Sequence, residues 1–364
     1  SPSTGGITRV WEQILSTWSL PGLHTAQAPL LLIDREASSA WLSRFPVIEL
    51  PALDPLDLEG VAEAAAVNAA LAHKHGAQVF LSSWISVCGG ERPACPELAL
   101  VHDCMPERSQ PQQPLLRMRR RWLRGAGAHL AVSADTAADL ESLLTRPAGS
   151  IPWEHPTPDS CFGQRPAAEA ADRLWWRLQA RGSLQQPFVL LPASSSIGSY
   201  KNPELVAHAL SDPALAHLQL LFCGAAAERH AQALAAAFPW LQGRIRSGSF
   251  TDLELAELYR RALVVLQPSR VEGFGLPAVE ALAAGGWVVA AEARGLREAG
   301  AGAVPRVDPA SPAALATWLQ LLLDPASRAW ISPHLERRRQ QRLQQLQPDR
   351  LGLALLALAR RLAA

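Results

Sequence analysis

The chain of 364 residues lacks several features that would place it in common classes of protein. Its five cysteines are few, odd in number and not spaced as the C-x-x-C pairs of metal sites, so we expect reduced, mostly buried thiols. No apolar run reaches the ~18 residues that a membrane-spanning helix requires, and no signal peptide is visible. The formal net charge of +1 excludes the concentrated basic field of a general nucleic-acid binder. We therefore expect a globular protein of the cytoplasm.

The chain is long enough for two domains of ordinary size, and 48% of its residues are hydrophobic. Short apolar runs alternate with helical patterns, which predicts α/β domains with parallel sheets. A Pro- and Gly-rich stretch at 145–170 separates two such series. The expected strands are 30–34, 79–82, 98–102, 130–132, 188–192, 219–223, 245–247, 262–266 and 287–291; the expected helices are 7–18, 58–73, 136–144, 203–210, 228–238, 252–262 and one from about Pro312.

The most informative segment is residues 267–292, QPSRVEGFGLPAVEALAAGGWVVAAE. The expected strand at 262–266 leads into a glycine-flanked loop that carries Glu272. A helix is expected to open at Pro277, because proline suits the first turn of a helix, and it carries Glu280. The segment therefore predicts a strand, a ligand-binding loop and a helix in direct succession.

The chemistry of this loop points to a ligand with both phosphate and hydroxyl groups. Gly273 and Gly275 let the backbone approach a ligand closely, and the N-terminus of the helix offers free N–H groups and a positive dipole to phosphate. Glu272 and Glu280 flank this anion site as acceptors for hydroxyl groups. A nucleotide sugar combines these groups, although a single glycine-rich turn is weak evidence by itself.

The order and spacing of these residues resemble the donor-binding motif of retaining glycosyltransferases with the GT-B fold, family 4 in particular. That motif reads roughly P-S-x-x-E-G-F-G-L-P-x-x-E-A-x-A-x-G, and the chain supplies every fixed position. The resemblance implies that Glu272 binds the ring hydroxyls of the sugar and that Glu280 binds the ribose hydroxyls. It further implies that the backbone of Gly273, Phe274, Gly275 and Leu276 contacts the phosphate.

The resemblance also implies the domain organisation, with two Rossmann-like α/β domains that have parallel sheets and face a central cleft. We expect an acceptor-side domain at 1–165, a linker at 166–185 and a nucleotide-sugar domain at 186–348. A helix at 349–364 is expected to cross back to the N-terminal domain. The chain opens with SPSTGGITRVW, which already matches the first glycine-rich loop of the family, so the first strand is expected to be missing.

Lys201 is the expected cation of the donor site. It lies in SIGSYKNPELVAHAL, between an expected strand and an expected helix. In the family, a lysine in this loop contacts the diphosphate of the donor, and a positioned cation stabilises such a leaving group. The family usually has an arginine five or six residues earlier, where Ser195 and Ser196 stand in this chain. Hydroxyl groups, backbone N–H groups or an arginine from elsewhere, such as Arg270, are candidates to compensate.

Two short segments of the N-terminal half complete the expected site. His102 and Asp103 follow an expected strand in LALVHDCMPE, where α/β proteins place ligand sites. The resemblance implies that His102 contacts the donor sugar near the reacting carbon and that Asp103 orients the loop or meets the acceptor. Gly6, in TGGITRVWEQIL with Gly5 and Arg9, is implied to face the donor phosphates or the acceptor; without the resemblance, this segment is a helix start with Thr4 as its cap.

A cluster of arginines has two interpretations. A run of charge is usually a solvated helix face, but basic residues mixed with aromatic and aliphatic ones can also hold a protein on anionic lipid. Because many relatives act on lipid-linked glycans, a peripheral position at the inner face of the membrane is the alternative to a purely cytoplasmic one. The arginines of this cluster are Arg117, Arg119, Arg120, Arg121 and Arg124.

The implied activity is retaining transfer of a hexose from a nucleotide sugar to the hydroxyl of an oligosaccharide or lipid-linked glycan, as in polysaccharide or lipopolysaccharide synthesis. No Asp-x-Asp metal motif occurs, so we expect no metal and no cofactor, with Lys201 and the helix at Pro277 holding the diphosphate. GDP-mannose is the favoured donor, on family habit alone, and UDP-glucose or a UDP-linked N-acetylhexosamine are the alternatives. The catalytic candidates are His102, Asp103 and Glu272.

The alternative to an enzyme is a catalytically inactive GT-B-like subunit that binds a nucleotide or a sugar. The missing arginine near Ser195 favours this alternative. The joint presence of Glu272, Glu280, Lys201 and His102 in matching contexts argues for an enzyme, because charged groups in a cleft are costly or useless without a ligand.

Overall fold

The computed structural model describes residues 5–364 except 21–29, 36–44, 55–56, 83, 91–92, 110–113, 183, 185–186, 193–194 and 225. The chain forms two compact units. The N-terminal unit contains Ile7–Pro156 and Pro348–Ala364, and the C-terminal unit contains Thr157–Gln347. Among the helices of the described residues, none is both long enough and apolar enough to cross a membrane.

A six-stranded sheet with all strands parallel forms the centre of the C-terminal unit. Its strands are β6 (Phe188–Leu191), β7 (Gln219–Cys223), β8 (Ile245–Gly248), β9 (Val264–Gln267), β10 (Val288–Ala291) and β11 (Arg306–Val307). The strand order is β11-β10-β9-β6-β7-β8, so the chain builds outward from β6, returns beside it with β9 and builds outward the other way. The strands β6, β7, β9 and β10 are buried along their whole length, as parallel strands covered by helices on both faces require.

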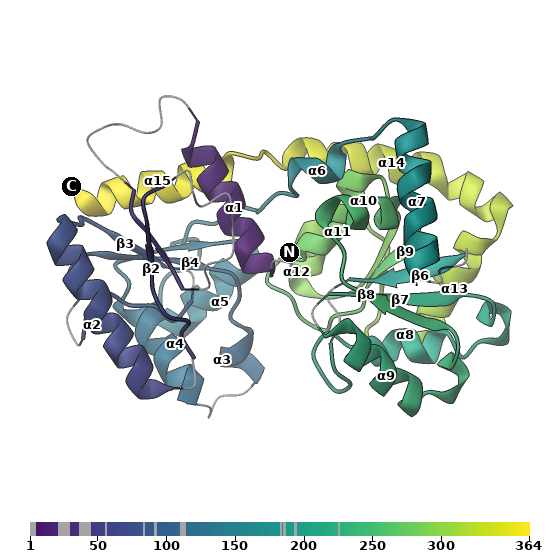
Figure 1. Ribbon diagram of the computed structural model, residues 1–364, viewed down its shortest axis with the longest axis horizontal. Coiled ribbons are helices and arrows are strands. Elements are labelled where there is room, and N and C mark those ends of the chain that lie inside the picture. Colours follow the sequence, from purple (N-terminus) through teal and green to yellow (C-terminus); the bar gives the residue numbers. More distant parts are fainter. Residues whose placement is uncertain are drawn as a thin grey trace. The chain divides into compact units, whose positions relative to one another are not determined.

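Helices cover both faces of this sheet (Figure 1). They are α6 (Ser160–Gly163), α7 (Ala168–Gly182), α8 (Pro203–Ala209), α9 (Ala227–Ala237), α10 (Asp252–Arg261), α11 (Leu276–Ala284), α12 (Arg294–Gly300), α13 (Pro312–Leu323) and α14 (Pro325–Gln345). On one face, α8, α9 and α13 form an apolar core with β6, β7 and β9, to which Val206, Leu234 and Leu319 contribute. On the other face, α10 packs against α11 and α7 (Figure 1).

The segment at 166–185, expected to be a linker, contains the helix α7 and belongs to the C-terminal unit. The helix is amphipathic, and its Trp175 and Leu178 are buried. The ring of Trp175 stacks on that of Phe188 in β6, with 5.9 Å between the ring centroids. The linker interpretation was wrong because this packing depends on residues that lie beyond the segment itself.

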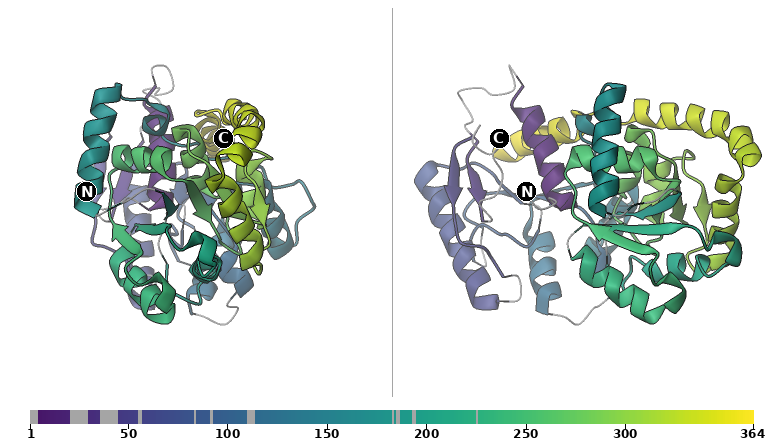
Figure 2. Two further views of the ribbon diagram at one scale, coloured as in Figure 1. Left: turned by 90° about the vertical axis from the view of Figure 1, so that its right-hand side faces the viewer. Right: turned by 45° about the vertical axis from the view of Figure 1, so that its right-hand side comes forward.

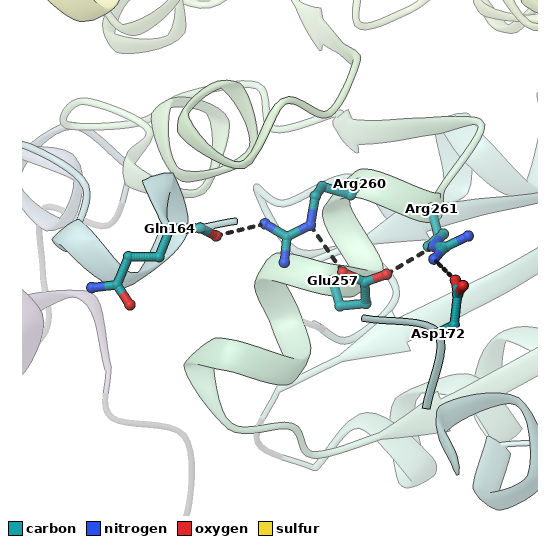
Figure 3. A network of polar contacts seen from close by, with 5 residues as sticks. All are labelled: Gln164, Asp172, Glu257, Arg260 and Arg261. Atoms are coloured by element: carbon teal, nitrogen blue, oxygen red, sulfur yellow. Dashed lines mark hydrogen bonds and ion pairs between the residues drawn. The ribbon is translucent and has the colours of Figure 1, made fainter. Parts of the chain in front are cut away.

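A polar network ties α10 to α7 and to the residues before it (Figure 3). The Glu257 side chain is buried, and its two oxygens accept hydrogen bonds from Arg260 Nε at 2.9 Å and Arg261 Nε at 2.8 Å. Arg261 Nη2 also pairs with Asp172 of α7 at 2.8 Å, and Arg260 Nη1 donates to the Gln164 carbonyl at 3.3 Å. Because a buried carboxylate needs partners on both oxygens, this network fixes the helix that precedes β9.

The N-terminal unit contains a parallel sheet with the order β3-β4-β5 and a separate parallel pair, β1-β2. The strands are β1 (Leu32–Asp34), β2 (Val47–Glu49), β3 (Phe80–Ser82), β4 (Glu97–Val101) and β5 (Ala128–Ala131). The helices are α1 (Gly6–Trp18), α2 (Leu58–His75), α3 (Met105–Ser109), α4 (Pro114–Gly125), α5 (Ala134–Leu144) and α15 (Arg350–Ala363). Every residue of β4 is buried, and this strand leads directly into His102.

The first and last helices of this unit lie against each other (Figure 2). Trp18 Nε1 donates to the Gly352 carbonyl at 2.8 Å, and Gln13 Nε2 donates to the Pro348 carbonyl at 2.7 Å. A Cβ atom at Gly352 would lie 2.9 Å from Thr17 Cβ, so glycine allows the close approach of α15 to α1. Residues 349–364, expected to return to the N-terminal domain, thus pack through α15 on α1, β4 and β5.

Candidate active site

The loops that follow β6 and β9 meet at the carboxyl edge of the six-stranded sheet. The two strands are neighbours, but the strands that come after them extend to opposite edges of the sheet. The chain therefore continues from β6 into α8 on one face and from β9 into α11 on the other (Figure 1). Open α/β sheets bind ligands at such a reversal of strand order, because the two connections diverge there.

Lys201 and Glu272 form an ion pair between these two loops. Lys201 Nζ lies 2.6 Å from Glu272 Oε1, and the side chains are 24% and 12% exposed. Burial alone would lower the pKa of Lys201, but the Glu272 carboxylate and Tyr200 outweigh burial and raise that pKa above its ordinary value. Lys201 is therefore fully charged, and the ion pair keeps both side chains at the place where the two loops meet.

Other hydrogen bonds join these two loops to each other and to the loop after β11. Asn202 Nδ2 donates to the Pro268 carbonyl at 3.1 Å and to the Pro309 carbonyl at 3.0 Å. The backbone N–H of Arg270 donates to the Tyr200 carbonyl at 2.8 Å. Lys201 thus stands between two residues whose backbone or side chain is fixed to the opposite loop.

Several helices begin at this edge without a capping side chain. α8, α9, α11 and α12 follow β6, β7, β9 and β10, and none of the four has a hydrogen bond from a capping side chain. By contrast, Thr251 caps α10 with a capping box, and Ser311 caps α13. Uncapped helix N-termini offer N–H donors and a positive dipole to an anion. The edge beside Lys201 is therefore suited to a negatively charged ligand.

Glycines set the conformation of the loop between β9 and α11. Gly275 forms the N-cap of α11 in the left-handed region, with φ of 109°. Gly295 of α12 packs directly under this loop, because a Cβ there would lie 2.4 Å from the Glu272 carbonyl oxygen and 2.8 Å from the Gly273 carbonyl carbon. Phe274 is only 4% exposed, so its ring anchors the loop.

The other predicted site residues of the C-terminal unit are Glu280, Leu276, Ser195 and Ser196. Glu280 is 1% exposed and lies inside the unit, where its Oε2 accepts a hydrogen bond from the Tyr259 hydroxyl at 3.4 Å. Leu276 is the first residue of α11. Ser195 accepts a hydrogen bond from the Ser199 hydroxyl at 3.1 Å, and the Ser196 carbonyl closes a turn with the Ser199 N–H at 3.3 Å.

His102 and Asp103 follow β4 in the N-terminal unit. Burial, with a smaller contribution from Arg119, lowers the pKa of His102 to about 4, so its imidazole is neutral at pH 7. Its buried Nε2 atom has no hydrogen-bond partner among the described residues. Asp103 Oδ1 accepts the Met105 N–H at 3.0 Å at the start of α3. A neutral imidazole with a free nitrogen can bind a hydroxyl group, and the sugar and acceptor roles of these two residues stay predictions.

Arg119 is not part of a solvated or lipid-facing cluster, as the arginine-rich sequence suggested. It is 1% exposed, and its guanidinium donates to Glu107 from Nε at 2.6 Å and from Nη2 at 3.1 Å. Nη2 also donates to the Asp103 carbonyl at 2.8 Å, and the guanidinium carbon lies 4.7 Å from the ring centroid of Trp84. Arg119 is buried because every third or fourth residue of α4 points inward, and it shares this inner face with Leu116 and Trp122.

Some residues of the site were not predicted from the sequence. In the C-terminal unit, Asn202 and Gly295 hold the loops after β6 and β9. In the N-terminal unit, Arg119 holds the loop after β4. One available signal concerned Lys201: the chain has only two lysines, Lys74 and Lys201, and all its other basic side chains apart from histidine are arginines. Lysine differs from arginine in presenting a compact ammonium group.

Gly6 is the first residue of α1, and a Cβ atom there would meet nothing within 4 Å. Packing therefore does not require glycine at this position, and its implied contact with the donor or acceptor stays a prediction. Among the described residues, no group of three or more His, Cys, Asp and Glu side chains is placed to hold a metal ion.

Comparison with known proteins supports the assignment of the fold. Residues 180–332 match the family model described as Glycosyl transferases group 1. No curated protein sequence matches the chain. The segment that matches lies in the C-terminal unit and contains Lys201, Glu272 and Glu280, and the match agrees with the predicted class of enzyme, a glycosyltransferase.

Solved structures of similar architecture cover almost the whole chain. Sucrose-phosphate synthase from Thermosynechococcus elongatus is 21% identical with a TM-score of 0.74, over 99% of this chain and 94% of that one. WaaG, a glycosyltransferase involved in lipopolysaccharide biosynthesis, is 17% identical with a TM-score of 0.74, over 97% and 96%. Anabaena HepE in complex with UDP-glucose is 17% identical with a TM-score of 0.69, over 98% and 97%. The predicted GT-B fold, with parallel sheets in two α/β units, is confirmed.

Proposed function

We propose that the protein transfers a hexose from a nucleotide sugar to the hydroxyl of a glycan, with retention at the anomeric carbon and without a metal ion. The observation that carries this proposal is the Lys201–Glu272 pair at the reversal of strand order, beside the uncapped N-terminus of α11. A cation and an uncapped helix N-terminus suit a diphosphate, and the adjacent carboxylate suits sugar hydroxyls. The involvement of WaaG in lipopolysaccharide biosynthesis supports an oligosaccharide or a lipid-linked glycan as the acceptor.

The proposed reaction takes place on one face of the sugar. The bond between the anomeric carbon and the diphosphate oxygen breaks through an oxocarbenium-like state, and the acceptor oxygen attacks from the same side. The leaving phosphate accepts the proton of the acceptor hydroxyl. Lys201 and the N–H groups at Phe274 and Gly275 stabilise the charge that develops on the leaving group. The anomeric configuration of the product, read by NMR, tests retention: an inverted product would contradict it.

A thermal-shift panel of nucleotides and nucleotide sugars tests the class of ligand first. A ligand at 100 times its Kd adds about 2.7 kcal/mol to the free energy of unfolding, which gives a clear rise in melting temperature. GDP-mannose is the first donor to test, and UDP-glucose, the ligand of HepE, is the second. Stabilisation by UDP compounds alone would exclude GDP-mannose, and no stabilisation by any member of the panel would contradict a nucleotide-sugar site.

Turnover separates an enzyme from a binding subunit. Donors that stabilise the protein are incubated without acceptor to detect slow hydrolysis and then with free and lipid-linked oligosaccharides, with products identified by mass spectrometry. Addition of a chelator should leave the rate unchanged. Tight binding without turnover over the whole panel would favour the inactive subunit, and chelator-sensitive turnover would contradict the metal-free mechanism.

Arg270 is expected to supply the second positive charge that the family places near Ser195. Glu272 offsets the charge of Lys201, whereas Arg270 is exposed and is held next to Tyr200 by its backbone hydrogen bond. We predict that Arg270→Ala weakens binding of a nucleoside diphosphate about 10-fold and leaves binding of the parent nucleoside unchanged, since a charge-assisted hydrogen bond contributes roughly 1.5–3 kcal/mol. Calorimetric titration of both ligands, with Arg337→Ala as the control, checks this. Equal losses for nucleoside and diphosphate would refute the charge argument.

Gly295→Ala is expected to disturb the donor loop without unfolding the unit. The new Cβ would meet backbone atoms of Glu272 and Gly273, which cannot move aside as a side chain could. Because misplacement of reacting groups by about 1 Å can cost 10²-fold in rate, we predict a loss of roughly that size in kcat/KM. Gly163→Ala is the matched control, since a Cβ at that helix position meets nothing within 4 Å. A folded Gly295→Ala protein with normal turnover would contradict this packing argument.

A further inference from the structure

Two cysteines of the N-terminal unit lie in contact in the loop between β3 and β4. Cys88 Sγ and Cys95 Sγ are 3.9 Å apart, and the two residues are 0% and 8% exposed. The chain turns back on itself here, with an antiparallel bridge between Gly89 and Pro93 and a hydrogen bond of 2.7 Å from the Ala94 N–H to the Cys88 carbonyl. The turn therefore places the two thiols side by side, although six residues separate them in the sequence.

This pair has no part in the proposed transfer reaction. It lies at the start of β4, whereas His102 follows the end of that strand. The two sulfurs must approach by about 2 Å to reach the bond length of a disulfide, which is about 2.0 Å. A change of side-chain rotamer supplies movement of this size.

A buried carboxyl group accompanies the two thiols. Glu97 is 3% exposed, and its Oε1 accepts a hydrogen bond from the backbone N–H of Cys88. Burial raises the pKa of Glu97, and the hydrogen bond from Cys88 and the charge of Arg121 only partly oppose this. Burial also raises the pKa of Cys95. The hydrogen bond to the Cys88 backbone holds this carboxyl group beside the residue that carries one of the thiols.

We propose that Cys88 and Cys95 are a redox-active dithiol that closes to an intrachain disulfide on reaction with a low-molecular-weight disulfide such as oxidised glutathione. Glu97 accepts the proton of the first thiol, and the thiolate attacks one sulfur of the oxidant. A mixed disulfide forms and one glutathione thiolate leaves. The second cysteine then attacks the mixed disulfide at the protein sulfur, and the second glutathione leaves. Two thiols are oxidised, one disulfide of the oxidant is reduced, and the two protein protons pass to the two glutathione thiolates.

The reaction is expected to be slow. Burial, the neighbouring Cys95 and the Glu97 charge raise the pKa of Cys88 to about 12, so little thiolate exists at neutral pH. Because the thiolate is the nucleophile, oxidation should take minutes to hours and should accelerate as the pH rises. Closing the bond fixes the turn whose Gly89 and Gly90 carbonyls accept hydrogen bonds from Arg121 of α4.

The test is a count of thiols in the native protein during incubation with excess oxidised glutathione. The partly exposed Cys161 is first replaced by serine, so that a simple adduct on that residue does not interfere. We expect the loss of two thiols, a decrease in intact mass by two hydrogens, and a peptide in which Cys88 is linked to Cys95. Dithiothreitol should restore both thiols. The variants C88S and C95S should each show no loss of mass by two hydrogens.

Glu97→Gln separates proton transfer from simple proximity. Its amide oxygen can still accept the Cys88 N–H, but it cannot accept the thiol proton, so we expect slower oxidation to the same end point. An equal rate in Glu97→Gln would remove the proposed role of Glu97. The proposal of a dithiol is overturned if the native protein keeps all its thiols, or gains glutathione without forming the Cys88–Cys95 link, while the same chain unfolded in denaturant does oxidise.

Discussion

Lys201→Ala is expected to lower donor turnover by roughly 10²–10³-fold, the effect of removing one preorganised group that stabilises developing charge. The ammonium group lies 2.6 Å from Glu272 at the edge where the uncapped helices begin, so it meets the diphosphate as negative charge builds on it. Binding of a nucleoside diphosphate should weaken as well, and binding of the nucleoside should not. Steady-state kinetics and calorimetric titration measure the two effects.

The scarcity of lysine offers a matched control and a direct probe. Lys74 lies in the last turn of α2 in the N-terminal unit, so Lys74→Ala removes the only other lysine without touching the site. With only these two lysines in the chain, acetylation followed by mass spectrometry reports on each separately. A nucleoside diphosphate should protect Lys201 and leave Lys74 reactive. Equal protection of both, or full turnover by Lys201→Ala, would contradict the diphosphate role.

Glu272→Ala distinguishes the two halves of the ion pair. It removes the carboxylate assigned to sugar hydroxyls and leaves the ammonium free for phosphate. We expect turnover to fall while affinity for a nucleoside diphosphate stays the same or rises, because the phosphate no longer competes with Glu272 for Lys201. Loss of diphosphate affinity in this variant would show that the carboxylate holds the lysine in place.

The donor loop could be predicted from the sequence because its determinants are local. One short segment contains the buried strand β9, Gly275 at the N-cap of α11 and Pro277 in the first turn of that helix. The order of these residues in the sequence is therefore enough to predict a strand, a loop and a helix. Lys201 could be placed in the same site only through the resemblance. Its contact with Glu272 depends on β6 and β9 being neighbours, a property of the whole sheet that no local pattern records.

The predictions that were wrong concern residues whose contacts are distant in the sequence. Arg119 was interpreted from charge as part of a solvated or lipid-binding face, and the segment of α7 was interpreted as a linker from the Pro- and Gly-rich composition beside it. Both are held by residues far away in the sequence. Arg119 needs Glu107, Trp84 and the Asp103 carbonyl, and α7 needs the ring of Phe188. The contact of Cys88 with Cys95 likewise follows from a turn that their spacing does not specify.

Arg119→Met is expected to cost about 3–5 kcal/mol of the free energy of unfolding of the N-terminal unit. The side chains of Arg119 and Glu107 are only 2% and 3% exposed, so the variant leaves a carboxylate buried without its cation. It also removes the hydrogen bond to the Asp103 carbonyl. Methionine keeps much of the aliphatic stem, so loss of packing contributes little. Denaturation in urea measures the change, and Arg117→Met on the exposed face of α4 is the control, with an expected effect within about 0.5 kcal/mol.

The double variant Arg119→Met/Glu107→Leu separates the value of the ion pair from the cost of breaking it. Replacing both charges removes the unpaired carboxylate, so much of the lost stability should return. The pKa of His102 should still change in the double variant, because the charge of Arg119 helps to lower the pKa of that imidazole. Without this charge the pKa of His102 should rise toward its ordinary value, and an NMR titration of the histidine follows it.

A stability loss in Arg119→Met no greater than in Arg117→Met would show that Arg119 does not hold the loop. Recovered stability with an unchanged pKa of His102 would show that burial alone keeps the imidazole neutral.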